Sequence, residues 1–376
     1  MANTVSIDAL RQELWAKELL DDVQRDVENV MRFMGEGPNN VVQVSRDLMK
    51  NAGDVETFGL VARLSGDGVT GDDELEGNEE SMLSYSEQVA IDQIRNAVRL
   101  KGKLDAQKVV YDQIKSAREV LRTWMKEFYC RQILLKMAGV TNTLLVDVNG
   151  APSSGRALWS NTPDFIPDAD TAAGTGARYL CADSTGAANL TAGTDILTLD
   201  LITTAATKAR LASPKIQPIS GDGEDFYVMY IHPLSARDLR KSSDWKTAQE
   251  NAKVRSDNNP VFRGALGYWS NVLLLENEYV PWLDINLDAN GGTSNNSFRG
   301  IATGTDYGAD CAANVLCGRQ AVLVAEASNP DALVVEQFDY KNKDGVAATF
   351  IGGCQKTMFN SKEFGVIQVD CAAANS

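Results

Sequence analysis

One long amphipathic run in the middle of the sequence limits what this chain can fold into. Between Leu104 and Met137 apolar residues recur at steps of three and four, and Lys, Arg, Asp and Glu fill the opposing face. The repeat begins Val110, Ile114, Ala117, Leu121, Trp124, Phe128. It predicts an α-helix of about 34 residues and roughly 50 Å. Helices in globular domains average about a dozen residues, so a run of this length is unusual for a compact enzyme domain.

Two extended runs precede this helix and flank an acidic loop. Apolar side chains occupy alternate positions at Phe58, Leu60, Ala62 and Leu64, and again at Leu83, Tyr85 and Val89, with Glu87 on the same side. This alternation predicts a β-hairpin whose strands have about ten residues and a length of roughly 30 Å. An isolated two-stranded ribbon is marginally stable in water. We therefore expect the hairpin to lie on another surface.

An amphipathic helix is predicted before the hairpin. Apolar residues at helical spacing run through residues 6–34, and Gly35, Gly37 and Pro38 then end the pattern. We expect this segment, with the connector up to Gly53, to form an arm that binds the surface of a partner.

A mixed α/β region follows the long helix. Segment 150–194 is rich in Gly, Ala, Ser and Thr and is expected to be a loop or surface insertion, as is the irregular stretch around 286–300. Between and after them the pattern predicts helices over 196–211 and 233–251, strands over 226–231, 265–267 and 271–275, and short β-like runs from 321 to 370.

The loop of the hairpin contains GDGVTG, Gly66 to Gly71, which has the spacing G-x-G-x-x-G of a dinucleotide-binding fingerprint. That fingerprint needs a helix to begin there, so that its first N–H groups face a pyrophosphate. Gly77 would break such a helix after one turn. The loop is also strongly acidic and has no Lys or Arg up to residue 80; its carboxylates are Asp67, Asp72, Asp73, Glu74, Glu76, Glu79 and Glu80. They would repel a pyrophosphate, which leaves a nucleotide-binding enzyme as a minor alternative.

The same carboxylates raise the question of calcium binding. An EF-hand register that begins at Asp72 places Leu83 at the terminal bidentate position, where leucine cannot act as a ligand. A looser divalent site stays open. We expect a solvated acidic loop.

The chain contains one histidine and six scattered cysteines. His232 follows an apolar strand and precedes Pro233, which suits the first position of a helix, so a packing or capping role is expected. The closest cysteines are Cys311 and Cys317, and without a CxxC pair they indicate reduced thiols instead of structural zinc. Because no catalytic constellation is evident, we expect a protein that is not an enzyme and uses no cofactor or metal.

The charge balance bears on possible partners. The chain has 51 acidic and 36 basic residues, a formal net charge of −15, which argues against tight nucleic-acid binding by the chain as a whole. The start, MANTVSID, has no basic and apolar signal regions, and no stretch approaches the ~20 apolar residues of a membrane span. We expect a soluble protein made inside a cell, with no membrane contact.

Six motifs spread along the chain carry a family resemblance. They are SGDGVTGDDELEGNEE, YSEQVAIDQIRNAVRLKGKLDAQKV, AREVLRTWMKEFYCRQILLKMAG, YIHPLSARDLRKSSDWKTAQENA, NPVFRGALGYWSNVLLLENEYVP and GVAATFIGGCQKTMFNSKEFGVIQVD. In this order they resemble the major capsid proteins of tailed bacteriophages with the Hong Kong 97-type fold, within the family typified by N4-like phages. The resemblance covers nearly the whole chain and is weakest at 150–194 and 286–318.

This resemblance implies an α+β fold with five parts. They are an N-terminal arm (1–50), an E-loop β-hairpin (51–91), a P-domain with a long spine helix (92–145), an α/β A-domain (146–334) with loop insertions near 150–194 and 286–318, and returning P-domain strands (335–376).

The implied function is structural. Subunits would self-assemble through hexamers and pentamers into an icosahedral shell around the double-stranded DNA genome, with portal, scaffolding and decoration proteins as partners. Assembly would take place in the bacterial host cytoplasm, and the protein would reside in the virion capsid. Another self-assembling shell or a tail component is the alternative.

Within such a shell, GDGVTG becomes the tip of an E-loop that lies across an adjacent subunit. The acidic tip is then expected to meet a basic patch on that neighbour. The candidates are Arg95, Arg99, Lys101, Lys103 and Lys108, or segment 237–246. Some relatives join subunits by an isopeptide bond from an E-loop lysine, but Ser65 to Glu80 contains no lysine. We predict no such bond from this loop.

Overall fold

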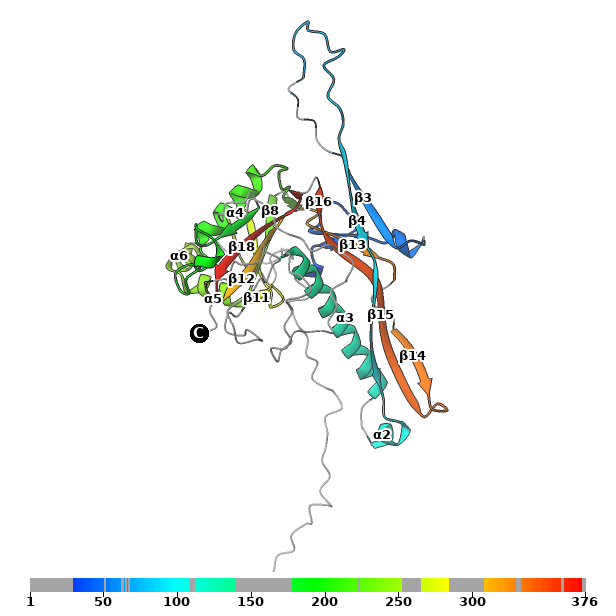
Figure 1. Cartoon of the computed structure of the whole chain (residues 1–376). Helices are drawn as coiled ribbons and strands as arrows, with labels where there is room; N and C mark the ends of the chain where they lie inside the picture. Colours follow the sequence, from blue (N-terminus) through cyan, green and yellow to red (C-terminus); the bar gives the residue numbers. More distant parts are fainter. Residues whose placement is uncertain are drawn as a thin grey trace, which may run out of the picture.

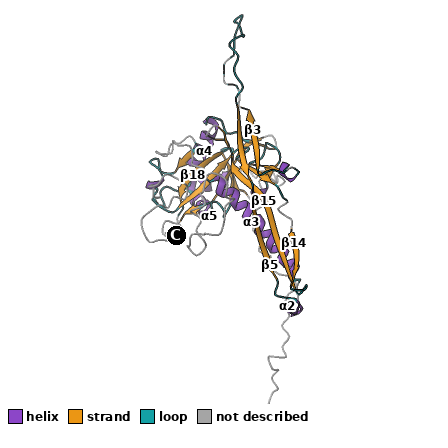
Figure 2. Cartoon of the chain, turned by 45° about the vertical axis from the view of Figure 1, so that its right-hand side comes forward, coloured by secondary structure: helices purple, strands orange, loops and turns teal. Residues whose placement is uncertain are grey.

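The computed structural model of the chain describes residues 30–50, 52–61, 64, 66, 68–108, 112–138, 178–221, 224–251, 265–283, 308–328, 333–359 and 362–373. A rounded lobe carries two projections that point in opposite directions, a β-hairpin with a long loop and a stalk of strands beside helix α3 (Figures 1 and 2). The helix expected over residues 6–34 lies outside the described residues up to position 29. Its predicted end is wrong, because helical backbone stops at Met31 and Met34 belongs to a strand.

Two main β-sheets organise the molecule. The six-stranded sheet has the order β1 (Met34–Gly35), β2 (Val42–Ser45), β13 (Val322–Glu326), β15 (Lys343–Lys356), β14 (Leu333–Phe338), and β5 (Asp92–Arg99) also pairs with β15. The eight-stranded sheet has the order β6 (Tyr179–Cys181), β18 (Val366–Ala372), β12 (Cys311–Cys317), β8 (Glu224–Ile231), β10 (Val272–Glu276), β9 (Ala265–Trp269), with β11 (Trp282–Leu283) on β12 and β7 (Ile219–Gly221) on β8. The short strands β16 (Met358–Phe359) and β17 (Lys362–Glu363) pair with each other. In the sequence they lie between β15 of the smaller sheet and β18 of the larger sheet.

The long helix is shorter than the sequence pattern predicts. Helix α3 spans Gln113–Met137, and a separate short helix, α2, spans Lys103–Lys108. The Asp112 side chain caps α3 by accepting the backbone N–H groups of Ile114 and Lys115. An N-cap aspartate satisfies N–H groups that a continuous helix would satisfy with its own carbonyls. The single helix from 104 to 137 is therefore wrong in its first part, and α3 is a rod of about 37 Å.

The helices of the lobe follow the predicted positions with one division. Helix α4 spans Leu199–Leu211 and begins at the N-cap Thr198. The helix expected over 233–251 is two helices, α5 (Pro233–Lys241) and α6 (Ser243–Asn251), because Ser242 adopts an extended ψ of 137° between them. Single turns of 3-10 helix occur at Asp47–Met49 and Ala187–Asn189. No helix among the described residues is long and apolar enough to cross a membrane.

Parts of both predicted insertions belong to the core. Tyr179–Cys181, within segment 150–194, is a buried strand, and so is Cys311–Cys317, within 286–318. All seven residues of β12 are buried, because its alternate side chains pack into two different hydrophobic clusters, with Val315 in one and Leu316 in the other. A strand covered on both faces shows no alternation of polar and apolar residues. The sequence CAANVLC therefore lacks the pattern by which a strand is predicted.

The C-terminal strands are divided between the two sheets. Strands β13, β14 and β15 lie in the six-stranded sheet, whereas β18 lies in the eight-stranded sheet. The chain therefore leaves the smaller sheet at the end of β15 and re-enters the larger one at β18.

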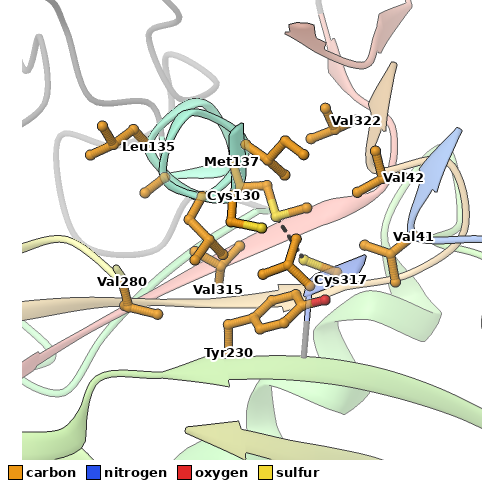
Figure 3. Packing of buried hydrophobic residues seen from close by; sticks show 14 of the residues in the cluster. Val41, Val42, Cys130, Leu135, Met137, Tyr230, Val280, Val315, Cys317 and Val322 are labelled. Atoms are coloured by element: carbon orange, nitrogen blue, oxygen red, sulfur yellow. Dashed lines mark hydrogen bonds between the residues drawn. The ribbon is translucent and has the colours of Figure 1, made fainter. Parts of the chain in front are cut away.

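A single hydrophobic cluster joins the two sheets through α3. Cys130 and Met137 of this helix pack toward Tyr230 and Cys317 of the larger sheet, and Val322 of the smaller sheet lies beside Met137 (Figure 3). All six cysteines of the chain are buried and none is in a disulfide, as expected for reduced thiols. Burial raises the pKa of Cys130, Cys181, Cys354 and Cys371 to about 12, so these thiols are poor nucleophiles.

Candidate intersubunit interface

The predicted hairpin is present and projects from the body. Strands β3 (Val55–Val61) and β4 (Ser84–Ala90) are antiparallel, with Phe58 opposite Glu87 and Leu60 opposite Tyr85. Each strand has seven residues instead of the expected ten. At the base, Val89 is buried against Leu323 and Ala325 of β13. Beyond this base the ribbon leaves the body and ends in the loop (Figure 1).

The acidic loop is exposed and is held by turns. Asp72, Asp73, Glu74, Glu76, Glu79 and Glu80 are all exposed, while Asp67 lies outside the described residues. The Gly77 N–H donates to the Glu79 carboxylate at 2.8 Å, and the Gly66 N–H donates to the Glu80 carboxylate at 2.6 Å. Gly68, Gly71 and Gly77 have positive φ angles of 73°, 71° and 91°, which glycine adopts without strain.

This loop lacks the context of a nucleotide site. Its described residues from Gly68 to Leu83 form turns and irregular backbone, and no helix begins among them. A pyrophosphate would therefore face carboxylates without the N-terminal N–H groups that the fingerprint requires. In the described part of the chain, no group of three or more His, Cys, Asp or Glu side chains is placed to hold a metal ion.

The predicted basic residues gather at the opposite end of the molecule. Arg95 and Arg99 are exposed on β5, and Lys101, Lys103 and Lys108 are exposed in and before α2. The Arg99 guanidinium lies over the Phe338 ring, 4.7 Å from its centroid. Within the described ranges none of these five side chains forms an ion pair.

The acidic loop and this basic set are not brought together within one chain. The loop lies at the end of the hairpin, and α2 lies at the far end of the stalk (Figure 1). The other predicted basic segment, 237–246, is already paired in part, because Arg237 contacts Asp238 at 3.0 Å and Arg240 contacts Glu276 at 2.5 Å. The set from 95 to 108 is therefore the more available counterpart for a second chain.

Sequence reasoning did not find a cavity of about 580 Å³ beside α3. Its walls come from three distant parts of the chain, and its lining includes Met31, Met34, Glu36, Val44, Arg46, Met125, Lys126, Tyr129 and Glu326. The Glu326 carboxylate accepts hydrogen bonds from the Tyr129 hydroxyl and the Arg46 guanidinium, both at 2.9 Å. Burial and the adjacent Glu326 charge raise the pKa of Tyr129 well above its usual value, so this hydroxyl stays protonated.

The capping role predicted for His232 is confirmed. Its Nδ1 accepts the backbone N–H of Leu234 at 3.3 Å at the start of α5. The imidazole stacks on Trp282, with ring centroids 6.0 Å apart and planes inclined by 10°. Burial lowers the pKa of His232 to about 4, which keeps the cap neutral and able to accept that hydrogen bond.

We expect this cap to make subunit stability depend on pH between about 6.5 and 4. In the unfolded chain the imidazole protonates near its ordinary pKa of about 6.5, whereas the folded pKa is about 4. The unfolded state therefore binds more protons in this window, and stability falls as the pH falls, by up to about 1.4 kcal/mol per unit. Urea unfolding at several pH values measures the slope. The variant His232→Asn keeps a capping side chain and should lose this part of the slope; an unchanged slope would contradict the assignment.

Comparison with known proteins decides the class of this molecule. The profile of the family described as phage capsid protein matches residues 3–375. The chain belongs to the phage capsid protein family. The major capsid protein of Pseudomonas phage KPP25 is 28% identical over 380 residues, which cover 93% of this chain and 92% of that protein.

Comparison with solved structures identifies the fold of this capsid protein. The capsid of Ralstonia phage GP4 superimposes with a TM-score of 0.78 and 28% identity, over 100% of this chain and 99% of that one. The cyanophage Pam1 capsid gives a TM-score of 0.74 and 23% identity, over 100% of both chains. The fold is the α+β Hong Kong 97-type capsid fold predicted from the sequence motifs. The protein is a major capsid protein of a tailed phage, and its copies associate into the capsid shell of the virion.

Proposed function

We propose that this capsid protein forms hexamers and pentamers that close into an icosahedral shell around double-stranded DNA, and that the β3–β4 hairpin of each subunit lies across its neighbour. One observation carries the proposal: the acidic loop and the unpaired basic set lie at opposite ends of the same chain (Figure 1). Charges so separated can meet only between copies. A subunit that offers a complementary group at each end can join a closed ring of identical contacts.

The same proposal assigns roles to the parts of the chain. Residues 1–50 act as the arm, 51–91 as the E-loop, 92–145 and 335–376 as the P-domain, and 146–334 as the A-domain. Membership in the N4-like group stays a prediction. The role is structural, without catalysis or a cofactor, and portal, scaffolding and decoration proteins are the expected partners. Assembly is expected in the bacterial host cytoplasm.

Expression of the chain alone and with its scaffolding protein tests this function. Electron microscopy and light scattering would then give the shape and mass of the products. We expect five- and six-fold capsomers or closed shells. Tubes or rings would support a tail component, and a monomer that never assembles, even with its partner, would contradict the proposal.

The acidic loop is expected to guide subunits into register. Exposed ion pairs contribute about 0–1 kcal/mol each and weaken with salt, but complementary charges accelerate encounter. The triple variant Asp72→Ser/Asp73→Ser/Glu74→Ser should therefore assemble more slowly or into irregular products, with a weaker dependence on salt. Light scattering at several salt concentrations measures this. Assembly kinetics equal to those of the unmodified chain at every salt concentration would contradict it.

The lysine-free loop leads to a second expectation for the assembled shell. Because Ser65 to Glu80 contains no lysine, this loop cannot supply the amine of an isopeptide bond, and we predict no such cross-link from it. Shells boiled in detergent and reducing agent should therefore run as a single monomer band. A ladder of covalent multimers would show that subunits are joined by another route.

A further inference from the structure

We propose that the cavity beside α3 receives the Leu75 turn of the acidic loop from a second copy of this chain. The inference rests on the proposed function, because it assigns the place on the neighbouring subunit where the apex of the hairpin is held. It concerns the final contact of the loop, which is apolar with one charge pair at its rim, whereas the basic set from 95 to 108 acts while the subunits approach each other.

The apex of the loop is a defined turn that presents a leucine. The Asn78 N–H donates to the Leu75 carbonyl at 3.0 Å, and Gly77 has a φ angle of 91°. A glycine with positive φ at the third position is typical of a type II turn. The Asn78 side-chain amide also donates to the Glu74 carbonyl at 2.8 Å. The Leu75 side chain remains 60% exposed, and burying a leucine against a partner removes an unfavourable contact with water.

The cavity offers an apolar interior of suitable size. Met31, Met34, Val44 and Met125 supply most of its apolar walls, and its volume of about 580 Å³ accommodates a leucine side chain with room for the turn. Met31 is 36% exposed, so part of this wall is open to an incoming group. Methionine side chains adapt their shape to what they contact, which suits a site that is filled only on assembly.

The charges at the rim match those beside Leu75. The leucine lies between Glu74 and Glu76. Lys126 is exposed on α3 at the cavity and makes no ion pair with the described residues. The two carboxylates of the cavity already have a cation, since Arg46 contacts Glu36 at 3.0 Å and Glu326 at 2.9 Å. An incoming Glu76 therefore meets the unpaired ammonium of Lys126.

The leucine and the cavity cannot meet within one chain. The loop lies at the end of the hairpin, and α3 lies on the other side of the hairpin base (Figures 1 and 2). The occupant is therefore another subunit. Charge complementarity and the exposed leucine select the acidic loop of that subunit in preference to other segments.

Cysteine cross-linking of assembled shells tests the contact. The natural thiols are all buried, so introduced cysteines react selectively. In shells of the variant Leu75→Cys/Met31→Cys, mild oxidation is expected to join subunits into a ladder that reducing agent removes. The control Leu83→Cys/Met31→Cys moves the thiol to another exposed leucine of the same loop and should stay monomeric. The inference would be overturned if neither variant gave a ladder, or if the two variants gave equal ladders. Either result would leave the proposed function intact, because the shells would still have formed.

Alkylation of Met31→Cys before and after assembly identifies other occupants. We expect the thiol to react in unassembled subunits and to be protected in shells. Protection already present in the unassembled subunit would mean that a segment of the same chain fills the cavity, which would overturn the inference. Failure of the unmodified chain to form any capsomer is a separate result, and it would contradict the proposed function itself.

A charge exchange gives an independent measurement. Lys126→Glu places a carboxylate opposite Glu76, and assembly is expected to slow by roughly fivefold, as the loss of one exposed pair implies. Glu76→Lys alone should have a similar effect, and the double variant should recover most of the rate. Lys115→Glu makes the same charge change elsewhere on α3 and should have little effect. A double variant as slow as either single variant would count against the pairing of Glu76 with Lys126.

Discussion

Lys356→Met is expected to lower the free energy of unfolding of the subunit by about 3–5 kcal/mol, and the double variant Lys356→Met/Glu363→Leu should regain most of that loss. The Lys356 ammonium lies 2.8 Å from a Glu363 carboxylate oxygen, and each side chain is only 1% exposed. Removal of the lysine leaves a buried carboxylate without this ammonium. Removal of both charges takes away the desolvation cost together with the attraction, which is why the double variant recovers.

The position of this ion pair gives it a role beyond local packing. Lys356 ends β15 in the six-stranded sheet, and Glu363 ends β17, just before β18 enters the eight-stranded sheet. The pair therefore closes the segment that carries the chain from one sheet to the other. Loss of Lys356 should loosen this connection, so the variant is expected to form capsomers poorly even where it remains folded.

Urea unfolding of unassembled subunits measures the effect through the shift of the midpoint at constant slope. Arg122→Met serves as a control, because Arg122 and Glu119 form an ion pair of 3.4 Å whose side chains are 46% and 52% exposed. That change should cost about 0–1 kcal/mol. A loss for Lys356→Met no larger than for Arg122→Met would show that the buried pair adds little to the stability of the fold.

The elements that were predicted best from the sequence are those with a solvent-exposed face. The β3–β4 hairpin alternates because one side of the ribbon is half-buried and the other is exposed. Helix α3 shows its repeat because Leu121, Met125 and Phe128 face the core while charged residues face outward. The acidic loop was recognised as exposed because seven carboxylates without a nearby cation do not form a packed interior.

The features that the sequence missed depend on contacts between distant segments. Strand β12 is covered on both faces, so its residues do not alternate. The cavity beside α3 takes its walls from residues 31–46, from 125–129 and from Glu326, and no local pattern marks such an assembly. Lys356 and Glu363 look like ordinary surface charges in the sequence, and only the meeting of the two sheets buries them.

Gly353→Ala is expected to destabilise the subunit by roughly 3 kcal/mol, at the upper end of the range for overpacked positions. A Cβ atom at this position would lie 2.0 Å from the Ala90 carbonyl oxygen and 3.3 Å from a methyl group of Val89. The first contact is with backbone, which cannot rotate away as a side chain can. Either β15 or the corner that joins β4 to β5 must move to admit the methyl group.

That corner is the base from which the hairpin projects, so the displacement has a second consequence. Ala90 ends β4, and Asp92, two residues later, pairs with Gly352 of β15. A shift at the base changes the direction of a long ribbon, and the loop at its end then misses the neighbouring subunit by more than the base moved. Gly59→Ala makes the same change within β3, where an added Cβ meets nothing within 4 Å, and it should leave unfolding and assembly nearly unchanged. Urea unfolding and light scattering of both variants measure the two effects, and equal behaviour of the two would mean that the close approach of β15 to Ala90 does not set the direction of the hairpin.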